Sequence, residues 1–142
     1  MAQVPLAIVP TYDEALNIGS LLESILILPS TFDVLIIDDN SPDGTAEVIR
    51  NYQNRPEFRD RIHLTERPRK MGLGTAYLTG FAWALERGYP FICEMDADFS
   101  HDPADLERLI SACQSADLAV GTRYMPGGGT EGNGGGVRAG WA

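Results

Sequence analysis

The chain has few of the residues that build covalently bridged or zinc-stabilised scaffolds. It contains two cysteines and two histidines in 142 residues, and neither Cys93 nor Cys113 belongs to a Cys-x-x-Cys or Cys/His pattern. Both cysteines lie in apolar stretches, so we expect buried thiols in a reducing compartment. The sequence therefore argues against a disulfide framework and against a structural zinc site.

Basic residues are also scarce. Eleven lysines and arginines face twenty aspartates and glutamates, and the formal net charge is -9. A surface of this sign does not suit the phosphate backbone of nucleic acids. The acidic excess has two interpretations, which are simple solubility or a cluster of carboxylates that holds a cation.

Long hydrophobic runs are missing as well. No apolar stretch approaches the roughly 18 to 20 residues that a membrane-spanning helix needs. The first residues, MAQVPLAIVP, lack the basic region and the cleavage site of a secretory signal. We therefore expect a cytoplasmic location, with the cytoplasmic face of a membrane as the more specific alternative.

Short buried strands alternate with helices along the chain. Brief apolar runs, some of them bounded by proline, predict strands, and apolar residues at helical spacing predict helices between them. The predicted strands are 4–9, 32–37, 61–64, 90–95 and 118–121, and the predicted helices are 14–28, 45–52, 71–87 and 103–115. This alternation is typical of an α/β protein with an open, doubly wound and mostly parallel sheet.

The two ends of the chain differ in composition. Residues 1–125 carry the alternating pattern and form one predicted domain, whereas residues 126–142 are rich in glycine and have almost no apolar periodicity. We interpret residues 126–142 as a flexible tail or as the truncated remainder of a further region.

Acidic turns follow two of the predicted strands. Asp38 and Asp39 come directly after the second strand, and Asp96 and Asp98 come after the fourth. Ligands bind beyond the carboxyl ends of the strands in such sheets, so both turns should lie at the same edge. An Asp-x-Asp pair can direct two carboxylates at one hard cation, such as Mg²⁺ or Mn²⁺, and leave positions open for phosphate oxygens. Taken alone, however, an acidic turn is more often merely solvated.

Further motifs accompany the two acidic turns in a fixed order. PTYDE follows the first strand, IIDDNSPDGT closes the second, GLGTAY opens the third helix, DADFSHDP follows the fourth strand and GTRY follows the fifth. With these motifs the chain resembles the family 2 inverting glycosyltransferases, and within them the polyprenyl-phosphate (dolichol-phosphate) mannosyltransferases. The resemblance covers about residues 4–129, and several ordered motifs are far more informative than any single one. It implies the GT-A fold, a Rossmann-like sheet that binds a nucleotide sugar.

The resemblance also implies roles for particular residues. Nucleotide-sugar contacts would come from Pro10, Tyr12, Glu14, Ile37, Asp39, Asp96, Ala97, Asp98 and Arg123. Metal ligands would come from Asp96, Asp98 and Ser100, and the catalytic set would be Asp96, Asp98 and Arg123.

Residue chemistry agrees with several of these roles. Tyr12 offers an aromatic face to a base, and Asp39 can accept from a base N–H or a ribose hydroxyl. The guanidinium of Arg123 suits phosphate. Lys70 before the glycine-rich turn could contact an anion or could simply precede a helix that packs on the sheet. His101 is a poor candidate for a catalytic base, because a phosphate acceptor is already ionised at neutral pH.

The resemblance predicts transfer of a hexose to a polyprenyl or dolichyl phosphate with inversion, assisted by Mg²⁺ or Mn²⁺, with mannose from GDP-mannose as the expected donor. Alternatives within the family are another donor, such as UDP-glucose or UDP-GlcNAc, or a polysaccharide acceptor.

The chain resembles a C-terminally truncated catalytic domain, because catalytic domains of this family run past this length. A nucleotide-sugar-binding module without catalysis is therefore a further alternative. An exposed sheet edge would favour homo-oligomers. A dinucleotide-binding protein is disfavoured, because the first strand is not followed by a Gly-x-Gly-x-x-Gly turn.

Overall fold

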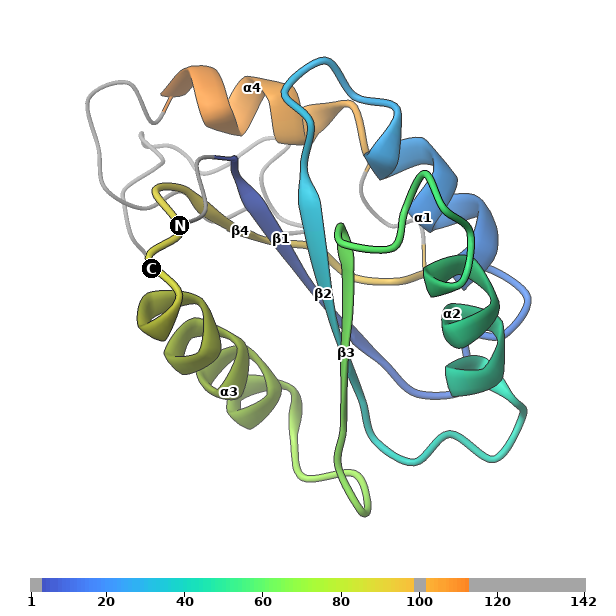
Figure 1. Cartoon of the computed structure of the whole chain (residues 1–142). Helices are drawn as coiled ribbons and strands as arrows, with labels where there is room; N and C mark the ends of the chain where they lie inside the picture. The colour runs from blue at the N-terminus through green and yellow to red at the C-terminus, as the bar shows by residue number, and fades with distance from the viewer. Residues whose placement is uncertain (1–3, 99–101, 113–142) are drawn as a thin grey trace.

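The computed structural model describes residues 4–98 and 102–112 of the chain. Strands and helices alternate along these residues, as the sequence pattern predicts (Figure 1). The strands are β1 (Leu6–Thr11), β2 (Asp33–Asp38), β3 (Ile62–Glu66) and β4 (Ile92–Glu94). The helices are α1 (Ile18–Leu26), α2 (Thr45–Gln53), α3 (Leu73–Glu86) and α4 (Asp105–Ala112).

The four strands form one parallel sheet in the order β3-β2-β1-β4. The chain builds the sheet outward from β1 in one direction through β2 and β3, and then returns to place β4 on the other side of β1. The strand order therefore reverses between β1 and β4, which is where an open α/β sheet places its ligand site. The predicted parallel sheet is confirmed, and the predicted fifth strand, 118–121, lies outside the described residues.

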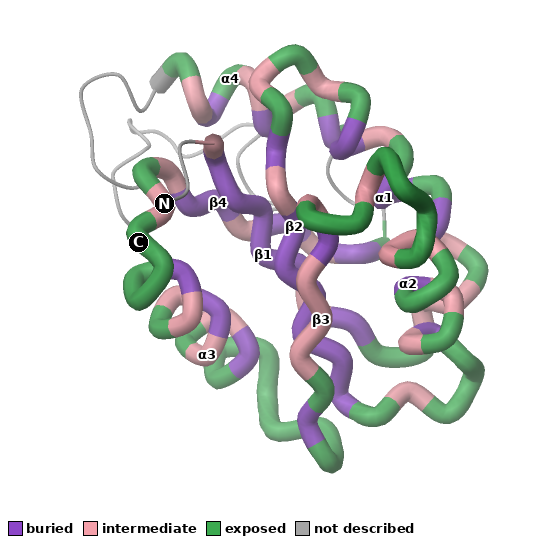
Figure 2. Tube along the Cα trace, viewed as in Figure 1, coloured by how far each residue is buried: buried purple, intermediate pink, exposed green. Residues whose placement is uncertain are grey.

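Helices cover both faces of the sheet. One apolar cluster joins α1, α2 and α4 to one face, and a second joins α3 to the other (Figure 1). Alternate residues of β1 divide between them, so that Ala7 and Val9 belong to the first cluster and Leu6 and Ile8 to the second. Figure 2 shows most of β1 as buried, and Pro10 is intermediate. Burial on both faces explains why the strands read as continuous apolar runs.

Strand β1 runs through Pro10 to Thr11, so the prediction that Pro10 ends the strand is wrong. Leu6 and Ile8 bond towards β4, through Leu6 N–H to the carbonyl of Phe91 and through the carbonyl of Ile8 to Met95 N–H. The backbone of Pro10 also faces the β4 side, but β1 pairs with β4 only as far as Ile8. A proline without an N–H costs no ladder bond at a position where the neighbouring strand has already diverged.

Helix α1 begins at Ile18, four residues later than predicted, and its first turn contains no acidic residue. Glu14, where the predicted helix 14–28 begins, therefore lies in the loop before the helix. Asp13 has a positive φ of 58°, and residues 13–15 form a loop that is hydrogen-bonded to the turn after β2. Long-range contacts, which a local pattern does not reveal, delay the helix.

Candidate nucleotide-binding site

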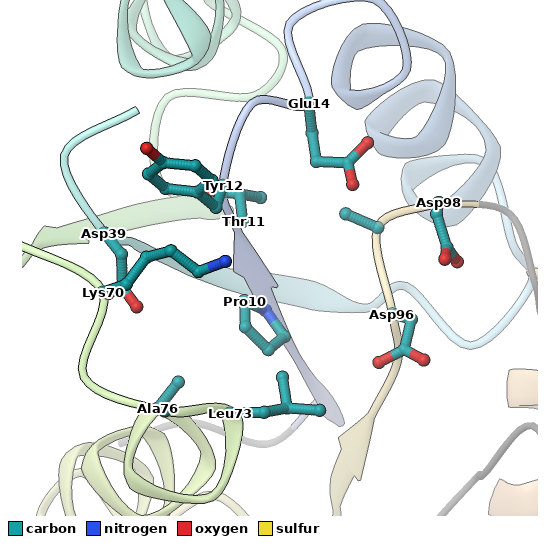
Figure 3. A pocket seen from close by; sticks show the side chains of 12 residues that line it. Pro10, Thr11, Tyr12, Glu14, Asp39, Lys70, Leu73, Ala76, Asp96 and Asp98 are labelled. Carbon is teal, nitrogen blue, oxygen red and sulfur yellow. The ribbon is translucent and has the colours of Figure 1, made fainter. Parts of the chain in front are cut away.

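A cavity of about 320 Å³ opens at the carboxyl ends of β1 and β4, where the strand order reverses (Figure 3). It is lined by Pro10, Thr11, Tyr12, Glu14, Asp39, Lys70, Gly72, Leu73, Ala76, Asp96, Ala97 and Asp98. The volume is at the lower end of the range for small-molecule sites. The cavity therefore stands at the position that the topology predicts.

The two acidic turns line the same cavity. Asp39 comes from the loop after β2, and Asp96 and Asp98 come from the loop after β4. Figure 3 shows Asp39 on one side of the space and Asp96 and Asp98 on the other, with the side chain of Lys70 extending between them. The expectation that carboxylates far apart in the sequence meet at one sheet edge is confirmed.

Most polar residues of the segment 38–45 support backbone rather than face the cavity. The backbone N–H of Asp13 donates to Ser41 Oγ at 2.9 Å, and that of Glu14 donates to Thr45 Oγ1 at 3.0 Å. The N–H of Ala15 donates to Asp43 Oδ2 at 3.0 Å. The turn after β2 thus fixes the loop that carries Tyr12 and Glu14 into the cavity.

Asp38 is the structural member of the Asp-Asp pair. It is 1% exposed, and its carboxylate accepts from the hydroxyls of Thr11 and Ser41 at 2.6 Å each. Its second oxygen accepts from the backbone N–H of Ser41 at 3.0 Å. These bonds join the ends of β1 and β2 and leave only Asp39 of the pair at the cavity.

Asp39 is paired with Arg67, a residue that no motif in the sequence singles out. The guanidinium donates through Nε to Asp39 Oδ1 at 2.7 Å and through Nη2 to Oδ2 at 2.9 Å. Contact with Asp39 raises the pKa of Arg67. The only signal in the sequence is a cluster of basic residues between β3 and α3, and the cluster does not reveal which member turns inward.

The side chain of Ile37 lies away from the cavity. It is 0% exposed and belongs to the apolar cluster beneath α3, with Leu35 and Ile8. The predicted contact of Ile37 with the nucleotide sugar therefore stays a prediction, and from this position its side chain offers no surface to the cavity. Strand alternation accounts for the orientation, because Ile37 faces α3 in a strand that is covered on both faces.

Lys70 stands over the aromatic ring of Tyr12. Its ammonium lies 4.7 Å from the ring centroid, within the range of a cation–π contact. Both residues line the cavity, and Tyr12 is 39% exposed. Of the two interpretations left open for Lys70, this position favours a role at the cavity over one in packing against the sheet.

The Asp-x-Asp pair after β4 has polar neighbours on β4 and α3. The hydroxyl of Tyr77 donates to Asp96 Oδ1 at 3.0 Å. Two residues before Asp96, Glu94 is half-buried, and burial together with the charge of Asp96 raises the pKa of Glu94 to about 7. Glu94 is therefore only partly ionised near neutral pH.

The lining residues fit a hard divalent cation. Four carboxylates and one ammonium group surround the cavity, which gives its lining a formal charge of -3 when all are ionised. Carboxylate oxygens are the ligands that Mg²⁺ and Mn²⁺ prefer, and Mg²⁺ characteristically uses one or two carboxylates together with phosphate oxygens and water. Within residues 4–98 and 102–112, no group of three histidine, cysteine or acidic side chains could hold a metal by itself. Asp96 and Asp98 are the described members of the predicted metal site, and the predicted residues Ser100 and Arg123 lie outside the described residues.

Comparison with known proteins identifies the family. The family model described as "Glycosyl transferase family 2" matches residues 6–138 of the chain. The chain belongs to glycosyltransferase family 2. This family assignment confirms the resemblance that the ordered motifs indicated.

Two curated relatives place this family 2 chain near the polyprenyl-phosphate enzymes. It is 44% identical over 127 residues to the polyprenol monophosphomannose synthase of Mycolicibacterium smegmatis, covering 89% of the chain and 47% of that protein. It is 45% identical over 127 residues to the undecaprenyl-phosphate mannosyltransferase of Micrococcus luteus, covering 87% of the chain and 49% of that protein. The chain thus spans about half the length of these relatives.

Solved structures confirm the GT-A fold of this family 2 chain. A mannosyltransferase from Pyrobaculum calidifontis, in complex with GDP-Man and Mn²⁺, matches with a TM-score of 0.51 and 28% identity over 56% of the chain and 24% of that structure. S. aureus TarS 1-349, in complex with UDP-GlcNAc, matches with a TM-score of 0.62 and 23% identity over 79% of the chain and 31% of that structure. At its lower identity, the TarS likeness concerns the fold alone.

Within the part of the chain that the structure describes, no helix has the length and apolar character needed to cross a bilayer.

Proposed function

We propose that the protein transfers mannose from GDP-mannose to a polyprenyl phosphate, with inversion at the anomeric carbon and with the assistance of Mg²⁺ or Mn²⁺. The observation that carries the proposal is the convergence of Asp39, Asp96 and Asp98 on one cavity at the reversal of the strand order. The curated relatives, at 44% and 45% identity, bear the names of mannosyltransferases that use polyprenyl phosphates.

The nucleotide would enter between the first two loops. Tyr12 and Pro10 offer apolar surface for a base, and Asp39 offers carboxylate oxygens to a base N–H or a ribose hydroxyl. Glu14 is held in the cavity wall because its backbone N–H is bonded to Thr45. We propose Pro10, Tyr12, Glu14 and Asp39 as the nucleoside side of the site.

The diphosphate would lie at the other side, near the Asp-x-Asp motif. A diphosphate cannot approach a lining of net negative charge without a counterion, so Asp96 and Asp98 would hold the divalent cation, and Ala97 would leave room between them. When bound, such a cation supplies Lewis-acid stabilisation of the departing diphosphate. We retain Ser100 as a further metal ligand and Arg123 as a phosphate contact.

The protein's own residues would bind and orient the two reactants. An acceptor phosphate oxygen attacks the anomeric carbon, the bond from that carbon to the diphosphate oxygen breaks, and its electron pair leaves with the nucleoside diphosphate. Because the acceptor is already an anion at neutral pH, no strong general base is needed, and His101 keeps no role in the proposal. Action on a lipid acceptor would place the protein at the cytoplasmic face of a membrane.

The decisive experiment is a transfer assay with the purified chain. We expect radiolabelled mannose to move from GDP-mannose to polyprenyl phosphate in the presence of Mg²⁺ or Mn²⁺ and not in EDTA. UDP-glucose and UDP-GlcNAc, assayed in parallel, test the donor, and a polysaccharide tests the acceptor. Calorimetric binding of GDP-mannose without turnover would instead identify a donor-binding module, and transfer that survives removal of metal would contradict the proposed role of the cation.

A further inference from the structure

Arg67 is a nearly buried cation whose side chain contacts two walls of the cavity. It is 9% exposed, and the side chain of its partner Asp39 is 11% exposed. Its guanidinium pairs with both oxygens of Asp39 at 2.7 and 2.9 Å. The remaining donors reach Thr75 Oγ1 at 3.0 Å and the carbonyl of Gly72 at 3.4 Å.

The pair with Asp39 fixes both the direction and the chemistry of that carboxylate. A guanidinium presents its donors in a rigid plane, and two parallel bonds prevent the carboxylate from turning about its last torsion. Each oxygen of Asp39 accepts one hydrogen bond from Arg67 and keeps a further lone pair with which it can accept another. A ligand group that reaches Asp39 must therefore donate.

The other contacts of Arg67 reach a second segment beside the cavity. Thr75 and Gly72 stand at the start of α3, and the loop between Arg67 and Gly72 carries Lys70 to its place over Tyr12. The backbone N–H of Arg67 also donates to the carbonyl of Asp38 at 2.8 Å. One side chain thus links the ends of β2 and β3 to the first turn of α3.

Stability alone is a weak explanation for this arrangement. A buried ion pair loses much of its Coulombic gain to desolvation, and apolar pairs of similar volume are often at least as stable. Here the pair lies at the cavity, and one member of it lines the cavity wall.

We propose that Arg67 is a positioning residue for donor binding, which acts by holding Asp39 and the 68–72 loop in the geometry that receives the nucleoside. The inference rests on the proposed function, in which Asp39 contacts the base or ribose. It predicts that changes at Arg67 weaken nucleotide binding through Asp39, and that they raise the KM for the donor more than they lower kcat.

The test measures GDP binding by calorimetry, with Mn²⁺ present and well below the unfolding temperature, for the unsubstituted chain, Arg67→Lys, Asp39→Asn and the double variant. Lysine keeps the charge but lacks the fork, so we expect Arg67→Lys to bind GDP about tenfold more weakly, as small misplacements in a site commonly cost this much or more. In the Asp39→Asn background, the same change should produce little further loss. Donor kinetics of the same variants supply the KM and kcat.

A second pair of variants covers the case in which Arg67→Lys does not fold. Thr75→Val removes one acceptor of the guanidinium at an exposed position, and Thr75→Ser retains the hydroxyl. We expect Thr75→Val to weaken GDP binding and Thr75→Ser to restore it. Folded variants that bind GDP like the parent, or losses at Arg67 and Asp39 that simply add, would overturn the positioning role alone. A parent chain that binds neither GDP nor GDP-mannose would overturn the proposed function itself, and the inference with it.

Discussion

The hydroxyl of Thr45 accepts a hydrogen bond from the backbone N–H of Glu14, 31 residues earlier in the chain, at 3.0 Å. Thr45 is 0% exposed, and its hydroxyl in turn donates to Asp43 Oδ1 at 2.5 Å. The bond from the Thr45 hydroxyl, together with those from the backbone N–H groups of Ala15 and Thr45, lowers the pKa of Asp43 below its ordinary value. The first residue of α2 thus secures a loop of the cavity.

Replacing Thr45 by valine should destabilise the protein and loosen the cavity. Valine has nearly the same shape, but it leaves the N–H of Glu14 without its acceptor, and a buried orphaned donor costs about 1 to 3 kcal/mol. Chemical denaturation checks the expectation. Thr79→Val is the matched control, because the Thr79 hydroxyl only bonds back to the Thr75 carbonyl within α3, and its effect should stay within about 0.5 kcal/mol.

Replacing Gly80 by alanine should destabilise the packing of α3 on the sheet. A Cβ at this position would lie 2.6 Å from Cγ2 of Ile8, closer than real contacts allow. Overpacking of this kind costs about 1 to 3 kcal/mol. Gly74→Ala is the control within the same helix, where nothing lies within 4 Å, and alanine should be neutral or stabilising by up to about 1 kcal/mol. Equal unfolding midpoints for the two variants would refute the close approach.

Replacing Asp98 by alanine should abolish metal-dependent sugar transfer. The proposed cation would lose one of its two carboxylate ligands, and donor binding in Mn²⁺ should weaken as well. Glu57→Gln removes an exposed carboxylate away from the cavity and should leave transfer unchanged. If Asp98→Ala transfers mannose as well as the parent does, the proposed metal role is wrong.

Replacing Lys70 by glutamine should weaken binding of GDP-mannose more than it alters stability. Lys70 is the one cationic residue among those that line the cavity, and loss of one charge-assisted contact to the anionic nucleotide sugar corresponds to roughly a tenfold change in Kd. Arg69→Gln removes an exposed charge one residue earlier, outside the lining. Calorimetric titration of both variants separates a local contact from a general effect of charge, which would weaken both equally.

His63 should make the protein less stable as the pH falls. Burial lowers the pKa of His63 below 6.5, and Arg87 adds to this, while Asp33 and Asp60 oppose it. The unfolded chain therefore binds the proton more readily, so stability is unaffected well above pH 6.5 and is lost as the pH falls through that value towards the folded pKa. The loss is modest, because the ring is only half-buried.

Unfolding curves between pH 7.5 and pH 5 check this expectation. His63→Phe removes the proton site and also the buried Nε2, which has no hydrogen-bond partner among the described residues. The phenylalanine ring can still pack against Trp83, whose ring centroid lies 4.9 Å from that of His63. The variant should lose less stability across this range than the parent, and curves that stay parallel would show that His63 does not contribute.

The sequence by itself determined the order of the elements and the edge of the sheet where the acidic turns meet. Short apolar runs and helical periodicity require an alternating α/β chain, and parallel strands place Asp39 and Asp98 beyond the same ends. These inferences succeed because they depend on local patterns and on the fixed handedness of crossovers.

Only the tertiary structure decided which polar residues of each turn reach the cavity. In the folded chain Asp38 joins the ends of β1 and β2, and Asp39 pairs with Arg67. Ile37 lies buried beneath α3, and α1 begins only at Ile18. Each of these outcomes depends on a partner distant in the chain or on which face of a strand a residue occupies. A buried polar group takes the best partner that the completed fold provides, and no local pattern of residues specifies that partner.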